Sequence, residues 1–477
     1  MLLMGAAATS RMVPNAFSAP FIRTGPDDRV VRIEEATYSV AEYPTRTPLK
    51  FGGSIVKRLA VLDVRCVISA PDGRRATGLG SMTLGNAWSF PSPKLSYDQT
   101  LGAMLALTPR LARITNEFKG YGHPMDLNAQ LEPAWLAAAV EAEKELNLGE
   151  PIPKLCAMVV ASPFDAAIHD AYGKLHRRSA YQAYGRKFLP RDLSHYLGAE
   201  FKGAWLDSYI RQKPKRAMPM YHLIGAADAL TRADIKQPLG DGLPETLPEW
   251  IEFNGLTHLK IKLNGDNLDW DTDRVISIER VTAQTQKKRG VSKWVYSLDF
   301  NEKCRHVDYV LEFIARVKEK APAGFSRIQY IEQPTARDLA ADRQNVMHKA
   351  AKLVPIVIDE SLTSLEMLNL AREMGYTGVA LKTCKGQSNA LLMAAAAQHK
   401  KMFLCVQDLT CPGASLIQSA GLAAHIPAVP AIEANARQFI PEANRQWEKS
   451  FPGIFQIKNG RMRTGTLTGW GLSAGPA

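Results

Sequence analysis

Apolar and polar positions alternate along short segments in the second half of the chain. In THLKIKLNG (residues 257–265) leucine and isoleucine alternate with histidine and lysine, the two-residue period of a β-strand. Each such segment is followed by a stretch with the three- and four-residue apolar spacing of a helix. Eight segments share this pattern: MPMYHLI, HLKIKL, WVYSLDF, RIQYIEQP, VPIVIDES, TGVALKT, MFLCVQD and PAIEAN. From the third segment on, the polar residues near their ends are 23 to 33 residues apart, about one βαβ repeat. The pattern predicts an α/β fold, a (β/α)₈ barrel.

The first half of the chain has a different pattern. Residues from about 32 to 82 alternate as strands do, and the turn PDG joins two of these segments. Residues from about 97 to 184 carry apolar side chains at helical spacing. Strands followed by helices predict a separate α+β unit before the barrel.

Composition narrows the function classes. Of the 477 residues, 46% are hydrophobic and 22% are charged, as in ordinary globular enzymes. No apolar run approaches the roughly 20 residues that cross a bilayer, so we expect no membrane partner. The net charge of +12 is scattered without a basic stripe, which disfavours nucleic acid and suits either a small anionic substrate or simple solubility. The six dispersed cysteines predict reduced, buried thiols.

The N-terminal residues 1–30 are interpreted as a disordered tail. Their short apolar stretch and the sequence AFSA leave a second interpretation, the remnant of an export signal. The first interpretation predicts a cytoplasmic protein and the second a periplasmic one.

Three consecutive predicted strands end in carboxylates. These are Asp299, Glu332 and Asp359, and the carboxyl ends of neighbouring barrel strands lie at one rim. Each carboxylate taken singly is explained as well by a helix cap or a lysine pair. Three together, flanked by lysines, favour a shared cation, and oxygen ligands suit Mg²⁺.

Lysines end two other predicted strands on opposite sides of the barrel. Taken alone, Lys260 and Lys262 on the second strand are typical of an exposed edge strand. With Lys382 on the sixth strand, however, Lys262 would face a second lysine across the rim, with the metal between them. A lysine acts as a base only if its pKa falls from about 10.4, and a neighbouring ammonium (Lys260) and a cation both lower it. The set predicts proton abstraction next to a carboxylate.

The motifs KIK, DFN, IEQP, IDES and ALKTCKG together resemble the enolase superfamily, in its muconate-lactonising-enzyme branch (the mandelate racemase/muconate lactonizing enzyme family). PFDAAIHDAYGKLHRRSAYQAYG is similar to a helix of that family's capping domain, and NGRMRTGTLTGWGL to the segment that returns to this domain. The resemblance implies a modified TIM barrel with an N-terminal α+β capping domain completed by the C-terminal segment. The implied boundaries are 31–215 for the capping domain, 216–440 for the barrel and 441–477 for the returning segment.

The resemblance also implies roles for individual residues. Lys262 and Lys382 would be the two bases, and Lys260 would assist with the substrate carboxylate. The metal ligands would be Asp299, Glu332 and Asp359. Thr47–Arg58 would be a loop of the capping domain that shapes substrate choice. Residues expected to support the site or contact substrate are Asn301, Glu360, Gln407, Asp408 and Glu433, and for the last three a structural polar role is equally expected.

We expect a Mg²⁺-dependent enzyme that removes the α-proton of a small carboxylate through a metal-stabilised enolate. Racemisation, epimerisation or cycloisomerisation ranks first, and syn-dehydration by a lyase second. The His–Asp pair of the mandelate-racemase branch is absent, and Glu433 is one acid where dipeptide epimerases carry two. A non-catalytic barrel scaffold with a vestigial site is the alternative of another class. The resemblance also implies a homo-oligomer.

Overall fold

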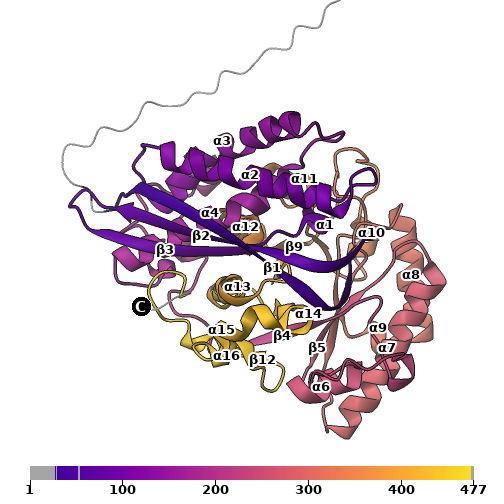
Figure 1. Ribbon diagram of the computed structural model, residues 1–477. Helices are drawn as coiled ribbons and strands as arrows, with labels where there is room; N and C mark the ends of the chain where they lie inside the picture. The colour runs from indigo at the N-terminus through magenta and orange to yellow at the C-terminus, as the bar shows by residue number, and fades with distance from the viewer. Residues whose placement is uncertain (1–26, 28, 52–53, 474–477) are drawn as a thin grey trace, which may run out of the picture.

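The protein was analysed as a computed structural model that describes residue 27, residues 29–51 and residues 54–473. Figure 1 shows a long three-stranded sheet with its helices lying against a barrel of strands and helices. The predicted tail, residues 1–30, lies outside the described residues except for residues 27, 29 and 30. No described helix is long and apolar enough to cross a membrane.

The capping domain is an antiparallel sheet in the order β1-β2-β3 covered by helices. Helix α2 begins with a capping box, in which Ser96 and Gln99 satisfy each other's backbone N–H groups. The elements are β1 (Arg32–Phe51), β2 (Ser54–Ser69), β3 (Arg75–Thr83), α1 (Asn86–Ser89), α2 (Tyr97–Glu117), α3 (Pro124–Glu145) and α4 (Lys154–Leu175).

Two glycines of β3 allow helix α4 to lie directly on the sheet. A Cβ atom on Gly78 would come within 2.0 Å of the Ala167 carbonyl oxygen, and one on Gly80 within 1.8 Å of that of Pro163. Both contacts are with backbone atoms, which cannot turn aside as a side chain can. The glycines of RATGLGSMT therefore serve close packing of strand and helix.

The second half of the chain is a closed barrel of eight parallel strands, as the strand period predicted. The strands follow one another from β4 to β11, β11 pairs with β4, and β12 adds to β4 from outside in antiparallel direction. The strands are β4 (Met218–Ile224), β5 (His258–Lys262), β6 (Val295–Asp299), β7 (Ile328–Glu332), β8 (Ile356–Ile358), β9 (Gly378–Leu381), β10 (Phe403–Val406), β11 (Ile432–Glu433) and β12 (Arg461–Met462).

Helices alternate with the barrel strands and form its outer layer. The longer ones are amphipathic; α8, for example, buries five apolar side chains on one face. They are α6 (Leu247–Asn254), α7 (Leu268–Lys288), α8 (Val307–Lys320), α11 (Leu365–Glu373), α12 (Gln387–His399) and α13 (Gly413–His425). Short helices are α5 (Ser194–Leu197), α9 (Pro322–Phe325), α10 (His348–Ala351), α14 (Ala436–Phe439), α15 (Arg445–Glu448) and α16 (Pro452–Phe455).

Strand register brings charged side chains to one level of the barrel. Lys262 is opposite Asp299, and Asp299 is opposite Glu332 in the next pair. Beneath this level the barrel interior is closed by packed side chains that include Tyr221, Tyr330 and Cys405. The charged groups therefore form the top layer of a filled barrel.

One expectation is confirmed and one is corrected by the fold. The strand with Lys260 and Lys262 lies inside the barrel rather than at an exposed edge, as its pairing with Lys382 predicts, because β5 pairs with β4 and β6 and both lysines are buried. The segment Thr47–Arg58 is not an open loop: it continues β1 to Phe51 and begins β2 at Ser54, and the residues between lie outside the described part. All six cysteines are unpaired and buried, as predicted.

Candidate active site at the mouth of the barrel

The predicted bases and metal ligands meet at the carboxyl ends of the barrel strands. Strand β5 carries two lysines, β6 and β7 each end in a carboxylate, and Asp359 and Lys382 directly follow β8 and β9. Each of the six residues is at most 5% exposed. Buried charged side chains are rare unless they are paired, so their partners define the site. The six are Lys260, Lys262, Asp299, Glu332, Asp359 and Lys382.

Lys260 lies at the centre of a cluster of carboxylates. Its Nζ atom is 2.7 Å from Glu433, 2.9 Å from Glu332 and 3.1 Å from Asp299. Lys262 donates a short hydrogen bond to Asp299. Asp299 and Glu332 thus converge on one cation, here an ammonium group.

Asp359 is the centre of a second group of charges. Lys382 Nζ lies 2.6 Å from its carboxylate, and Lys385 Nζ lies 3.2 Å from the other carboxylate oxygen. Lys385 also donates to the Asp359 backbone carbonyl oxygen. The sequence interpretation missed Lys385, although ALKTCKG shows it three residues after Lys382. That spacing places it on the turn η5 (Thr383–Lys385) beside the first lysine.

The carboxylates perturb one another's protonation. Burial raises the pKa of Glu332 to about 8, and the charge of Asp299 adds to this rise. Burial would also raise the pKa of Asp299, but the ammonium groups of Lys262 and Lys260 outweigh it and hold that pKa below its usual value. Asp299 is therefore held ionised, whereas the raised pKa of Glu332 favours its protonated form near neutral pH.

For Lys382, the predicted lowering of the pKa is outweighed by these carboxylates. Burial lowers the pKa of Lys382 and Lys260 lowers it further, as expected. The charges of Asp359 and Glu332 nevertheless raise the pKa of Lys382 above its usual value. A cation that shared those carboxylates would lower the pKa of Lys382.

The carboxylates fit a divalent cation in chemical type, because oxygen ligands suit Mg²⁺. Among the described residues no group of three or more His, Cys, Asp or Glu side chains is arranged so that it could hold a metal ion; the cations they share here are lysine ammonium groups. The buried mouth contains six carboxyl groups and four lysines, and burial raises the pKa of three of the carboxyls, Glu332, Glu360 and Asp408. The carboxyl groups belong to Asp299, Glu332, Asp359, Glu360, Asp408 and Glu433, and the ammonium groups to Lys260, Lys262, Lys382 and Lys385.

The other predicted residues support this cluster. Asn301 has φ of 46°, and its backbone N–H, rather than its side chain, donates to Asp299 at 2.8 Å. Gln407 donates a short hydrogen bond to Glu332, and Glu433 contacts Lys260. Asp408 accepts the backbone N–H groups of Cys411 and Asn435, both at 3.2 Å. The structure thus brings all five groups to the charged layer or its backbone, and Glu360 also accepts the indole N–H of Trp88 in the capping domain.

Comparisons with known proteins agree with this architecture. Residues 243–476, about half of the chain, match the family model described as enolase C-terminal domain-like. Through this half, the chain belongs to the enolase C-terminal domain-like family. No curated protein has a significant sequence match to it.

Solved structures share the fold of this family member over most of its length. A racemase from Streptomyces coelicolor A3(2) with bound magnesium has a TM-score of 0.58 at 16% identity, covering 92% of this chain and 96% of its own. A muconate lactonizing enzyme from Pseudomonas fluorescens complexed with muconolactone has a TM-score of 0.51 at 18% identity, covering 82% and 84%. A dipeptide epimerase from Cytophaga hutchinsonii complexed with Mg and D-Ala-L-Val has 0.56 at 15%, covering 94% and 96%. At these identities the similarity is one of fold.

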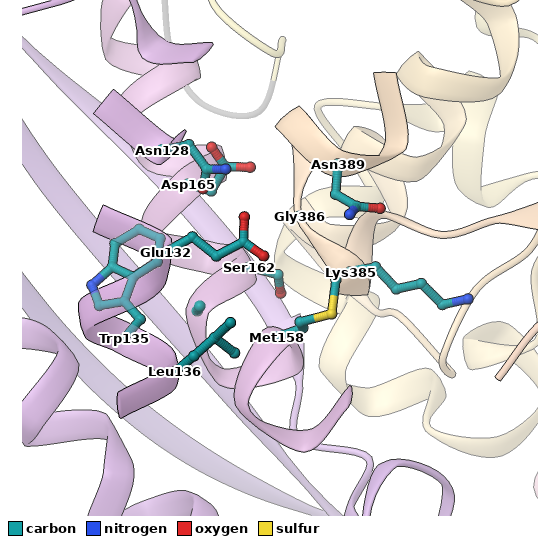
Figure 2. A pocket seen from close by; sticks show the side chains of 11 residues that line it. Asn128, Glu132, Trp135, Leu136, Met158, Ser162, Asp165, Lys385, Gly386 and Asn389 are labelled. Carbon is teal, nitrogen blue, oxygen red and sulfur yellow. The ribbon is translucent and has the colours of Figure 1, made fainter. Parts of the chain in front are cut away.

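Two hollows of this enolase C-terminal domain-like chain lie away from the charged layer. One is a cavity of about 20 Å³ between α3, α4 and the start of α12 (Figure 2), with room for one or two water molecules. Burial raises the pKa of Glu132 in its wall. Lys385 contributes to the wall, but Figure 2 shows its side chain directed away from the carboxylates Glu132 and Asp165.

The second hollow, of about 390 Å³, lies at the opposite end of the barrel, beside the starts of β9 and β10. Several of its cations follow or end helices α10 to α12, where they offset the negative ends of the helix dipoles. This position accounts for them without a ligand. The basic residues are His348, Lys352, Arg372, Lys400 and Lys401.

Proposed function

We propose that the protein is a Mg²⁺-dependent isomerase that removes and returns the α-proton of a small carboxylate substrate. The observation that carries the proposal is the placement of two buried lysines across one barrel mouth. Lys262 ends β5 and Lys382 follows β9, four strands apart in a closed barrel of eight. A substrate held between them would present one face to each lysine.

The lysines would act as acid and base on the two faces. One lysine, as the neutral amine, takes the proton from the substrate carbon, and the opposite lysine, as the ammonium, returns a proton to the other face. Lys260, 2.9 Å from Glu332 and central to the cluster, would offset charge on the substrate carboxylate. This arrangement serves racemisation and epimerisation directly, and cycloisomerisation if one lysine only stabilises charge.

Asp299, Glu332 and Asp359 would hold Mg²⁺. The bound ion would neutralise negative charge as the substrate loses its proton. Support comes from the carboxylates gathered at the barrel mouth and from the family match, together with fold neighbours whose structures contain magnesium. The same residues acting on a substrate that loses water would make the protein a lyase, and the products formed in deuterium oxide separate the two activities.

Deuterium incorporation tests the proposal. The protein is incubated with Mg²⁺ in deuterium oxide with a panel of hydroxy acids, N-acylated amino acids and cyclic carboxylates, and products are followed by mass spectrometry. We expect a gain of one mass unit with retained composition, at least about 10³-fold faster than in Lys262→Ala/Lys382→Ala.

The matched control is Lys349→Ala/Lys352→Ala, which removes two exposed lysines and should leave the exchange unchanged. Loss of water from a hydroxy acid would identify a lyase. Absence of exchange for every substrate, together with absence of Mg²⁺ binding by calorimetry, would refute the proposal in favour of a non-catalytic barrel.

A further inference from the structure

A tryptophan of the capping domain reaches into the charged layer. Trp88 lies on the short helix α1 (Asn86–Ser89), between β3 and α2, and is 5% exposed. Its indole Nε1–H donates to Glu360 Oε1 at 2.8 Å, and its backbone carbonyl accepts a hydrogen bond from Arg337 Nη2 at 2.9 Å. Two barrel residues thus fix both the ring and the backbone of Trp88.

The segment that carries Trp88 is seated closely on the barrel. A Cβ atom on Gly85 would come within 2.6 Å of the Leu409 side chain, on the loop after β10. Arg337 also binds Glu302, so the residue that holds the Trp88 carbonyl is itself held at 2.7 Å. The ring position is therefore determined from several sides.

The indole ring of Trp88 lies over the two lysines that follow strand β9. Lys382 Nζ lies 4.4 Å from the Trp88 ring centroid, and Lys385 Nζ lies 5.7 Å from it. An ammonium group is attracted to an indole face at such distances, most strongly where water is excluded. Lys382 is 4% exposed, so the contact forms in a desolvated place.

We propose that Trp88 is a positioning residue for Lys382, holding its ammonium group between the indole face and Asp359 at one face of the substrate. This inference rests on the proposed function of Lys382 as a base. Trp88 also belongs to the apolar core of the capping domain. Filling that core does not require its four polar contacts, which are with Lys382, Lys385, Glu360 and Arg337. Trp88 should therefore affect proton transfer only at the substrate face next to Lys382.

The first test measures α-hydrogen exchange of each enantiomer of a chiral substrate separately, by mass and by chiral chromatography. In Trp88→Leu we expect exchange of the enantiomer that faces Lys382 to fall about tenfold or more, together with inversion. Exchange without inversion of the other enantiomer should change less than about threefold. Trp88→Phe, which keeps an aromatic face but loses the N–H donor to Glu360, should restore most of the lost exchange.

Trp294→Leu is the matched control. Trp294 is a buried tryptophan that also stacks on a cation, with Arg327 3.9 Å from its ring, but it directly precedes β6 at the other end of the barrel. It should leave the ratio of the two exchange rates unchanged. Equal losses for both enantiomers in Trp88→Leu, or the same ratio in Trp294→Leu, would overturn the proposal.

A second test does not depend on activity. The rate at which an amine-reactive reagent, methyl acetimidate, labels Lys382 is measured by peptide mass spectrometry in folded protein. We expect a severalfold rise in Trp88→Leu and little change in Trp88→Phe and Trp294→Leu. If no carboxylate exchanges in the wild type, the proposed function fails, and labelling still decides whether Trp88 holds Lys382. Labelling that is unchanged in Trp88→Leu would refute the positioning role.

Discussion

At the scale of single residues, Lys385 shows that the hydrogen-bond partners of a buried lysine fix the position of its ammonium group. It has the same charge as the two proposed bases, but its Nζ atom donates to both the carbonyl oxygen and the carboxylate of Asp359. A lysine held in this way orients its partner. Its 3% exposure means that the pair is desolvated, so removing one member leaves the other uncompensated.

Lys385→Met should therefore lower the free energy of unfolding by about 3 kcal/mol, because a buried carboxylate loses one of its partners. Denaturant unfolding at neutral pH measures the change. The exposed Lys349→Met serves as the control and should remain within about 0.5 kcal/mol of the wild type. A change as small in Lys385→Met would contradict the desolvated pair.

His222 is a second residue whose burial has a measurable consequence. It lies on β4 with its ring 5.0 Å from that of Trp250, and burial, with the charge of Arg437, lowers its pKa from 6.5 to about 3. The unfolded chain therefore binds a proton between these values and the folded protein does not. Stability from this group is complete above pH 6.5 and is lost as the pH falls.

His222→Leu should reduce the pH dependence of the unfolding free energy by about 1.4 kcal/mol per pH unit between pH 6 and pH 4. Urea unfolding at several pH values measures the slope. His348→Leu, an exposed histidine, is the control. An unaltered slope in His222→Leu would show that the buried imidazole is not the group that titrates on unfolding.

At the scale of elements, strand β3 and helix α4 illustrate packing that fixes residue identity. Gly80 faces the Pro163 carbonyl so closely that no side chain fits, whereas a Cβ atom on Gly102, in the middle of α2, would have nothing within 4 Å. The same substitution at these two sites therefore tests packing against helix propensity.

Gly80→Ala should destabilise the protein by more than about 3 kcal/mol, since backbone atoms of α4 must move. Gly102→Ala should stabilise it by about 0.5–1 kcal/mol, because alanine loses less backbone entropy in a helix. Thermal unfolding measures both. The two shifts should have opposite signs, and shifts of the same sign would contradict the strand–helix contact.

At the scale of the whole molecule, the capping domain and the barrel are joined around the charged layer. Arg46 of β1 binds the Leu243 carbonyl at 3.1 Å, Lys50 of β1 contacts Asn264 at 3.2 Å, and Trp88 binds Glu360. A cation bound at the mouth therefore acts on a region that both domains contact. We expect the free energy of unfolding of the whole chain to change when such a cation binds.

Mg²⁺ at 100 times its dissociation constant should raise the free energy of unfolding by about 2.7 kcal/mol, and a chelator should reverse it. Glu332→Gln, which removes one proposed ligand but keeps its shape, should abolish most of the gain. Unfolding with and without Mg²⁺ measures the effect. An equal gain in Glu332→Gln would place the cation elsewhere.

The period of the strands and the residue types at their ends could be predicted from the sequence, because both depend only on residues close together along the chain. Alternation in THLKIKLNG and its successors indicated the eight strands, and register then placed Lys262, Asp299 and Glu332 side by side. The segment Thr47–Arg58 was interpreted as a loop because a hairpin end and a loop share polar and glycine residues.

What only the tertiary structure decided is which charges meet. Lys260 contacts Glu433, which is 173 residues away, and Trp88 contacts Glu360 across 272 residues. Such pairs depend on closure of the barrel and on docking of the capping domain, and no local pattern encodes them. The sequence by itself determined the barrel and the candidate bases and ligands, because periodicity and residue type are local. The folded chain decided their pairing, burial and pKa directions, because electrostatic interactions depend on distance in space.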